Sequence, residues 1–105
     1  MNKFDLYSMI FLALDADWDD THDEELGRYL SDANPFLFAG EVSAVRSVYN
    51  DFSAFIGDRA IEKENSFEIA KEYVRHINID AVTESFALLE EEQWNEALEE
   101  YLASK

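Results

Sequence analysis

The residues best suited to chemistry lie together in the segment LDADWDDTHDEEL, Leu14 to Leu26, which holds seven Asp or Glu residues and one His. Carboxylates at alternate positions are typical of a calcium-binding loop. A His next to carboxylates is typical of a transition-metal site or of a general base. A dense group of acids also attracts a basic protein. These three interpretations make different demands on the neighbouring residues.

A calcium loop of the EF-hand type requires Gly at its sixth position and a bidentate Glu at its twelfth. Taking Asp15 as the first ligand gives acids at the third, fifth and ninth positions, which are Asp17, Asp19 and Asp23. The sixth position is then Asp20 and the twelfth is Leu26. Because the turn residue and the bidentate ligand are both missing, we expect no calcium site of this type.

Two histidines could serve as ligands or bases elsewhere in the chain. His22 lies beside Asp19 and Asp23, but no further residue there completes a tetrahedral ligand set. His76 follows Glu68 and Glu72 at intervals of four, so all three lie on one helix face. Di-iron bundles use a spacing of three on two helices, so we expect a solvated, salt-bridged surface instead. We predict no metal site and no cofactor.

No residue is a convincing nucleophile. The chain has no Cys, its Ser residues lack the setting of a nucleophile elbow, and no Gly-rich phosphate loop is present. Acids make up almost a quarter of the residues, so a pair of carboxylates does not by itself identify acid–base catalysis. We therefore predict that the protein is not an enzyme.

The apolar residues that must position these side chains recur at helical spacing throughout. The clearest pattern is Val45, Val48, Tyr49, Phe52 and Ile56, with Gly57 as the residue that ends the helix. The first helix is expected to end at about Ala16, and its unusually broad apolar surface predicts a central position with neighbours on several sides. We expect helices that begin at the cap residues Asn2, Thr21, Asn65 and Asp80. We expect further helices over about 41–56 and 90–102. We also expect Ala97, Tyr101 and Leu102 to be buried. Between the second and third helices, Pro35 is expected to open a turn that carries Phe36 to Phe38.

The fold class follows from these patterns and from the composition. The 105 residues include three Gly and one Pro, and no segment alternates as a strand does. At 48% hydrophobic residues the chain is not a disordered acidic tail. We predict a single all-α domain over residues 1–105, a compact bundle of five to six short helices.

The formal net charge of −16 excludes several classes of partner. Such a charge repels phosphate backbones and anionic lipid, so we expect no binding to nucleic acid or to membranes. The longest apolar run is MIFLAL, too short to span a bilayer, and Asp5 interrupts any resemblance to a signal peptide. With no Cys, the chain fits a reducing compartment, and we expect a cytoplasmic location.

In size, acidity and helical pattern the chain resembles the small immunity proteins of bacterial toxin systems, which bind and block a basic toxin domain. The resemblance implies an inhibitor in which acids attract the partner and aromatic residues anchor it. A related possibility is a DNA mimic, whose carboxylates imitate phosphates. No motif is matched residue by residue, so the resemblance assigns no role to any position.

The candidate partner-binding residues therefore come from the acidic segment itself. They are Asp15, Asp17, Trp18, Asp19, Asp20, Asp23 and Glu24. Asp23 and Glu24 also have a structural reason to occur, because acids favour the start of a helix. Trp18 is either the anchor for the partner or a core residue that closes the corner between two helices.

Alternatives remain open at this point. A second acidic face, Glu90 to Glu100, is the alternative candidate for the partner, because few bases balance it. The protein is otherwise a stand-alone helical domain with a structural or regulatory role, or a metal-dependent protein that uses its carboxylates.

Overall fold

The computed structural model describes residues 1–35 and 46–104 and confirms the predicted all-α bundle. These ranges hold six α-helices and no strand. The helices are α1 (Lys3–Thr21), α2 (Glu24–Ala33), α3 (Arg46–Ile56), α4 (Lys63–Ile77), α5 (Asp80–Ala87) and α6 (Glu91–Ala103). The predicted turn at Phe36–Phe38 and the predicted helix start at Glu41 lie outside the described residues.

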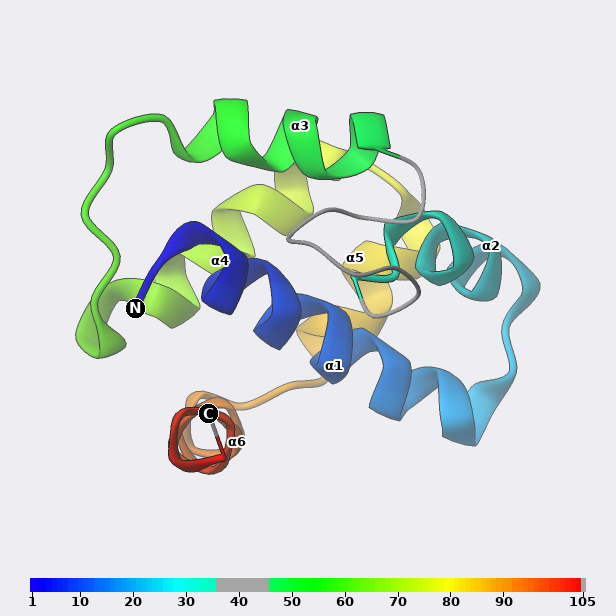
Figure 1. The fold of residues 1–105 in the computed structure, drawn as a ribbon. Coiled ribbons are helices and arrows are strands. Elements are labelled where there is room, and N and C mark those ends of the chain that lie inside the picture. The colour runs from blue at the N-terminus through cyan, green and yellow to red at the C-terminus, as the bar shows by residue number, and fades with distance from the viewer. Residues whose placement is uncertain (36–45, 105) are drawn as a thin grey trace.

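Helix α1 is the central element, as its broad apolar surface predicts. In Figure 1 it crosses the middle of the molecule, between α3 on one side and α6 on the other. It contacts all five other helices. Its start is fixed by a capping box, in which the Asn2 side chain accepts a hydrogen bond from the Asp5 N–H and the Asp5 carboxylate accepts one from the Asn2 N–H. Every residue from Asp5 to Phe11 is buried.

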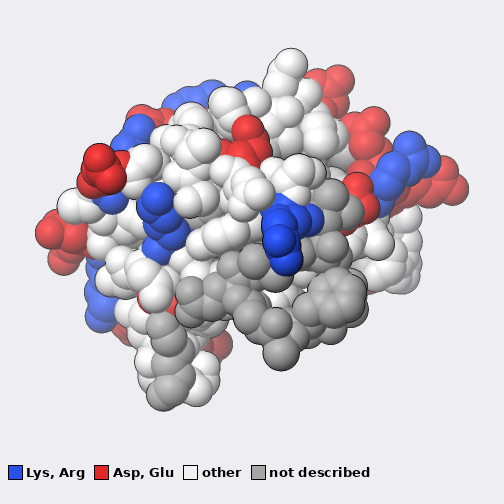
Figure 2. All heavy atoms as spheres, turned by 45° about the horizontal axis from the view of Figure 1, so that its top comes forward, with Lys and Arg blue, Asp and Glu red and all other residues white. Residues whose placement is uncertain are grey.

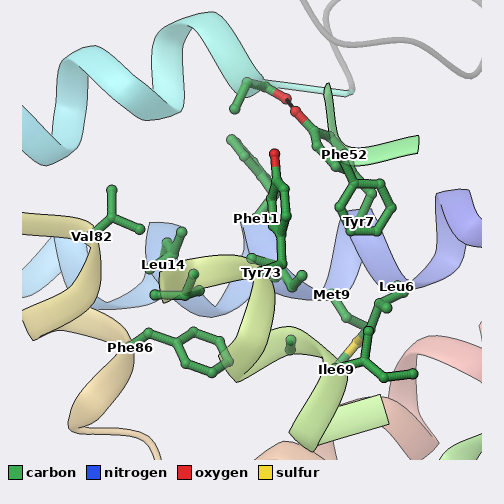
Figure 3. Close-up of a cluster of buried hydrophobic side chains, with 14 of the residues drawn as sticks. Leu6, Tyr7, Met9, Phe11, Leu14, Phe52, Ile69, Tyr73, Val82 and Phe86 are labelled. Atoms are coloured by element: carbon green, nitrogen blue, oxygen red, sulfur yellow. Dashed lines mark hydrogen bonds between the residues drawn. The ribbon is translucent and has the colours of Figure 1, made fainter. Parts of the chain in front are cut away.

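The core on the α3 side of α1 is built from aromatic rings. Phe52 of α3 meets Tyr7 of α1 and Tyr73 of α4 edge to face, with ring centroids 5.1 and 4.8 Å away. Such pairs add about 0.5–1.5 kcal/mol each beyond the burial of apolar area. The Tyr7 hydroxyl donates a hydrogen bond of 2.6 Å to the Ala33 carbonyl at the end of α2 (Figure 3). These contacts hold α2, α3 and α4 on one side of α1.

Helix α6 is attached through fewer buried side chains. Trp94 is 1% exposed, and its Nε1 donates a 2.9 Å hydrogen bond to the Ser66 hydroxyl of α4. Leu98 is the other buried residue of this helix. The prediction that Ala97 is buried is wrong, and Tyr101 and Leu102 are only half-buried. Helix α6 packs along a narrow stripe, which leaves one of its faces without a neighbour among the described residues.

Several predicted helix boundaries differ from the structure. Asn65 is the third residue of α4 and not its cap, because its side chain accepts a 2.8 Å hydrogen bond from the N–H of Glu62, the actual cap residue. Asp80, which was predicted to be a cap, is instead the first residue of α5, and Ile79 occupies the cap position. Gly57 has a φ of +59°, which confirms its predicted role after α3.

Candidate functional site

The acidic segment forms the end of α1 and a tight corner into α2. Helix α1 continues to Thr21, so the expectation that it ends near Ala16 is wrong. His22 follows in the left-handed conformation with a φ of 51°, and its N–H donates to the Trp18 carbonyl at 2.7 Å. The cap of α2 is Asp23 rather than Thr21, because its carboxylate accepts a 2.9 Å hydrogen bond from the Leu26 N–H.

Trp18 closes this corner. Its indole Nε1 donates a 3.1 Å hydrogen bond to the Asp23 carbonyl, and its ring lies directly over Gly27 of α2. The His22 ring meets it edge to face at 4.8 Å. Trp18 is half-buried, so part of its surface remains open to solvent. Of its two predicted roles, the structure shows the corner-closing one, and its role as an anchor for a partner stays a prediction.

The predicted carboxylates lie on more than one side of α1. Asp15 and Asp19 are four residues apart and share one side, whereas Asp17 and Asp20 share another. Burial raises the pKa of the Asp15 carboxyl above its ordinary value, and the Asp19 carboxylate raises it further. A positive charge brought close to Asp15 and Asp19 would offset the repulsion between these two carboxylates.

The remaining predicted residues of the corner are accessible. Asp19, Asp20, Asp23 and Glu24 are all exposed, while Asp15 and Asp17 are half-buried. Within residues 1–35 and 46–104, no three His, Asp or Glu side chains are grouped so that they could hold a metal ion. The corner thus offers exposed negative charge beside a partly exposed indole.

The acids of α4 have cationic neighbours, as predicted for a salt-bridged face. Glu68 pairs with Lys71 at 2.8 Å, and Glu72 pairs with Arg59 of the preceding loop. His76 lies 3.3 Å from the Asp51 carboxylate of α3, and its ring stacks against Tyr73. The two Lys and Arg pairs are solvent-exposed, and such pairs contribute about 0–1 kcal/mol each.

Tyr73 does not supply a reactive group next to His76. Burial raises the pKa of its phenol, and the Asp51 carboxylate raises it further. The hydroxyl therefore stays protonated at neutral pH and lies within 3.5 Å of the Asp51 carboxylate, to which it donates. Asp51, Tyr73 and His76 join α3 to α4.

The charges are distributed unevenly along the chain. The segment 4–27 contains eight acids and no Lys or Arg, and the segment 76–104 contains another eight acids and again no Lys or Arg. The other eight acids equal the eight bases in number, so the entire net charge of −16 comes from these two segments. Figure 2 shows a face that includes balanced parts of the chain, where Lys and Arg lie among Asp and Glu.

A groove between α1 and α6 joins the two acidic segments, and the sequence did not indicate it. Its volume is about 560 Å³. Most of the side chains that line it are apolar, namely Met9, Leu12, Ala13, Ala16, Leu89, Trp94, Ala97 and Tyr101, with Glu100 and Ser104. Leu12 is 40% exposed although it lies in the middle of the central helix. Ala97, which lines the groove and is exposed, was predicted from its spacing to be buried.

No protein-family model, no curated protein and no solved structure matches this chain. Over the described ranges, none of the helices combines the length and the apolar character that crossing a membrane requires.

Proposed function

We propose that this protein binds a basic protein and masks a cationic surface of it, as an immunity protein or inhibitor does. The observation that carries the proposal is the separation of charge along the chain. Sixteen acids occur in two segments without any Lys or Arg, while the rest of the chain is balanced. We also propose that this binding takes place in the cytoplasm, since the chain has no Cys.

Asp5 helps to hold the fold together, because its carboxylate closes the capping box of α1 and accepts a hydrogen bond from Tyr101 of α6. The other acids of these two segments form no ion pair among the described residues. Among the described residues, Glu68 pairs with Lys71 and Glu72 pairs with Arg59, and both acids belong to α4. Like charges on α6, such as Glu92, Glu96 and Glu100 at intervals of four, cost a few tenths of a kcal/mol per pair. A cationic partner offsets this cost and is attracted at an increased association rate.

The proposal is tested by capture of a partner from the source cell on immobilised protein, at about 50 mM and about 500 mM NaCl. We expect a basic protein to be retained at low salt and released at high salt, because exposed charges are screened over about 4 Å at the higher concentration. If no salt-sensitive basic partner is retained, the protein is a stand-alone helical domain and the proposal fails.

A matched pair of variants separates the acidic corner from net charge. Asp19→Asn with Asp20→Asn removes two exposed charges of the corner, and Asp32→Asn with Asp58→Asn removes two exposed charges elsewhere. We expect the first variant to weaken the captured complex about two- to thirtyfold and the second to leave it nearly unchanged, because each of two lost ion pairs contributes about 0.2–1 kcal/mol. Equal effects of the two variants would mean that only the total charge matters.

A further inference from the structure

We infer that the groove between α1 and α6 receives a cationic, amphipathic helix of the partner. This inference rests on the proposed function and names the element of the partner that is recognised. Helix-in-groove recognition places apolar residues at i, i+3, i+4 and i+7 of the ligand into an apolar groove. The groove here has the lining and the surrounding charges that such a ligand requires.

The α1 side of the groove is an apolar stripe that ends in acids. Met9, Leu12, Ala13 and Ala16 follow the spacing i, i+3, i+4, i+7 and all line the groove. Asp19 and Asp20, three and four residues beyond Ala16, are exposed and flank the end of this stripe on its two sides. An apolar ligand helix lying along this stripe therefore has carboxylates at one end.

The α6 side repeats this arrangement. Ala97 and Tyr101 line the groove together with Glu100, which is an exposed residue. Glu96 lies four residues before Glu100, so both are on the same side of α6, and both are exposed. Neither Glu96 nor Glu100 has an ion-pair partner in the described part of the chain. Negative charge therefore borders the apolar lining on this side as well.

Charge complementarity selects the occupant. Helix α6 has no Lys or Arg, and the only base of α1 is Lys3, which donates to Ser53 of α3 instead. A second copy of this chain would bring its own acids towards Glu96, Glu100, Asp19 and Asp20. Its base-free helices would be repelled, whereas a helix with Leu on one face and Lys or Arg beside it pairs with both the lining and the edges.

The experiment uses two synthetic peptides of identical Leu and Lys composition, each labelled with a fluorophore. In one, Leu recurs at i, i+3, i+4 and i+7, and in the other the same residues are spread evenly around the helix. Both carry the same charge, so non-specific attraction to an acidic protein is equal for the two. We expect fluorescence anisotropy to show binding of the amphipathic peptide that is at least about tenfold tighter, which corresponds to 1.4 kcal/mol. Equal affinities, or no binding of either peptide, would overturn the inference.

Variants of the protein locate the peptide. Ala97→Trp introduces a large side chain at the groove, and Ala54→Trp introduces the same side chain at another exposed alanine, on α3. We expect the first to weaken the amphipathic peptide about tenfold or more and the second to have no effect. Leu12→Ser, which removes apolar lining without filling the groove, is expected to act in the same direction. If Ala97→Trp and Leu12→Ser both leave the affinity unchanged, the peptide binds elsewhere and the inference fails.

The outcomes distinguish this inference from the proposed function. If the Ala97→Trp variant captures a basic partner as well as the wild type does, the groove is not the binding site and this inference fails, while the proposal of charge masking stands. If the amphipathic peptide binds in the groove but no basic partner is captured from the cell, the proposed function fails, while the groove remains a binding site for a cationic helix. Dimerisation of the wild-type protein that Ala97→Trp abolishes, measured by analytical ultracentrifugation, would show that a second copy occupies the groove and would overturn the inference.

Discussion

Two serines show how differently a buried hydroxyl contributes in this core. Ser8 of α1 and Ser66 of α4 are both 0% exposed. The Ser66 hydroxyl accepts the hydrogen bond of Trp94 Nε1 and donates to the Lys63 carbonyl at 3.0 Å. The Ser8 hydroxyl has no hydrogen-bond partner in the part of the chain that the structure describes. Removing the Ser66 hydroxyl and removing the Ser8 hydroxyl should therefore change the free energy of unfolding in opposite directions.

We predict that Ser8→Ala stabilises the protein and that Ser66→Ala destabilises it. Removing an unsatisfied buried hydroxyl and placing Ala in a helix should raise the free energy of unfolding by about 1 kcal/mol. Removing Ser66 leaves the Trp94 N–H buried without its acceptor, which should lower the free energy of unfolding by about 1–3 kcal/mol. Urea denaturation followed by circular dichroism measures both. Changes of the same sign for the two variants would contradict the assignment of their hydrogen bonds.

At the scale of elements, the corner between α1 and α2 depends on one close approach. A Cβ added at Gly27 would lie 2.7 Å from Trp18 Nε1, closer than real side chains come. The indole atom is part of a rigid ring that is itself hydrogen-bonded to the Asp23 carbonyl, so it cannot move away without breaking that bond. Gly27 is within α2, where Gly is otherwise unfavourable by about 1 kcal/mol relative to Ala.

The effect of Gly27→Ala should therefore change sign with the residue at position 18. In the wild-type background we expect the free energy of unfolding to fall by about 1 kcal/mol, because displacement of the Trp18 indole outweighs the gain in helix propensity. In a Trp18→Ala background, the same change should raise it by about 0.5–1 kcal/mol. A double-mutant cycle by urea denaturation gives the coupling directly. Additive effects would mean that Trp18 does not pack on Gly27 in solution.

Periodicity predicted most of these elements, but not how they close against each other. The Asn2 cap, the apolar spacing before Ile56 and the turn at Gly57 are local patterns, and the structure confirms them. The predicted end of α1 near Ala16 lies five residues before the observed end at Thr21, in a segment where acids are unfavourable for the helix dipole. The extra turn is stabilised instead by Trp18 packing on α2, a tertiary contact that spacing does not reveal.

The groove was missed for a related physical reason. A residue such as Leu12 or Ala97 has the apolar character of a core position, and only the packing of α6 against α1 decides whether a neighbour covers it. The acidic residues of both segments were identified from the sequence because charge is a property of composition. The groove between the two segments requires the three-dimensional arrangement of α1, α5 and α6.

The whole molecule concentrates a net charge of −16 in a small volume. Its radius of gyration is 12.7 Å, close to the value of about 13 Å expected for a compact chain of this length. Unfolding separates the charges, so mutual repulsion in the folded state lowers its stability. Because only two exposed ion pairs with Lys or Arg occur in the described residues, attraction between exposed charges offsets little of this repulsion.

We therefore predict that added salt stabilises the protein. Raising NaCl from about 20 to about 500 mM shortens the Debye length from roughly 20 to roughly 4 Å, which screens repulsion across most of the molecule. The midpoint of urea denaturation should increase, and urea is the appropriate denaturant because guanidinium chloride would itself screen the charges. Asp19→Asn with Asp20→Asn should reduce the salt response, since it removes charge from the denser acidic region. A midpoint that falls with salt would show that favourable ion pairs dominate, and it would remove the energetic argument that the acids of α1 and α6 are available to a cationic partner.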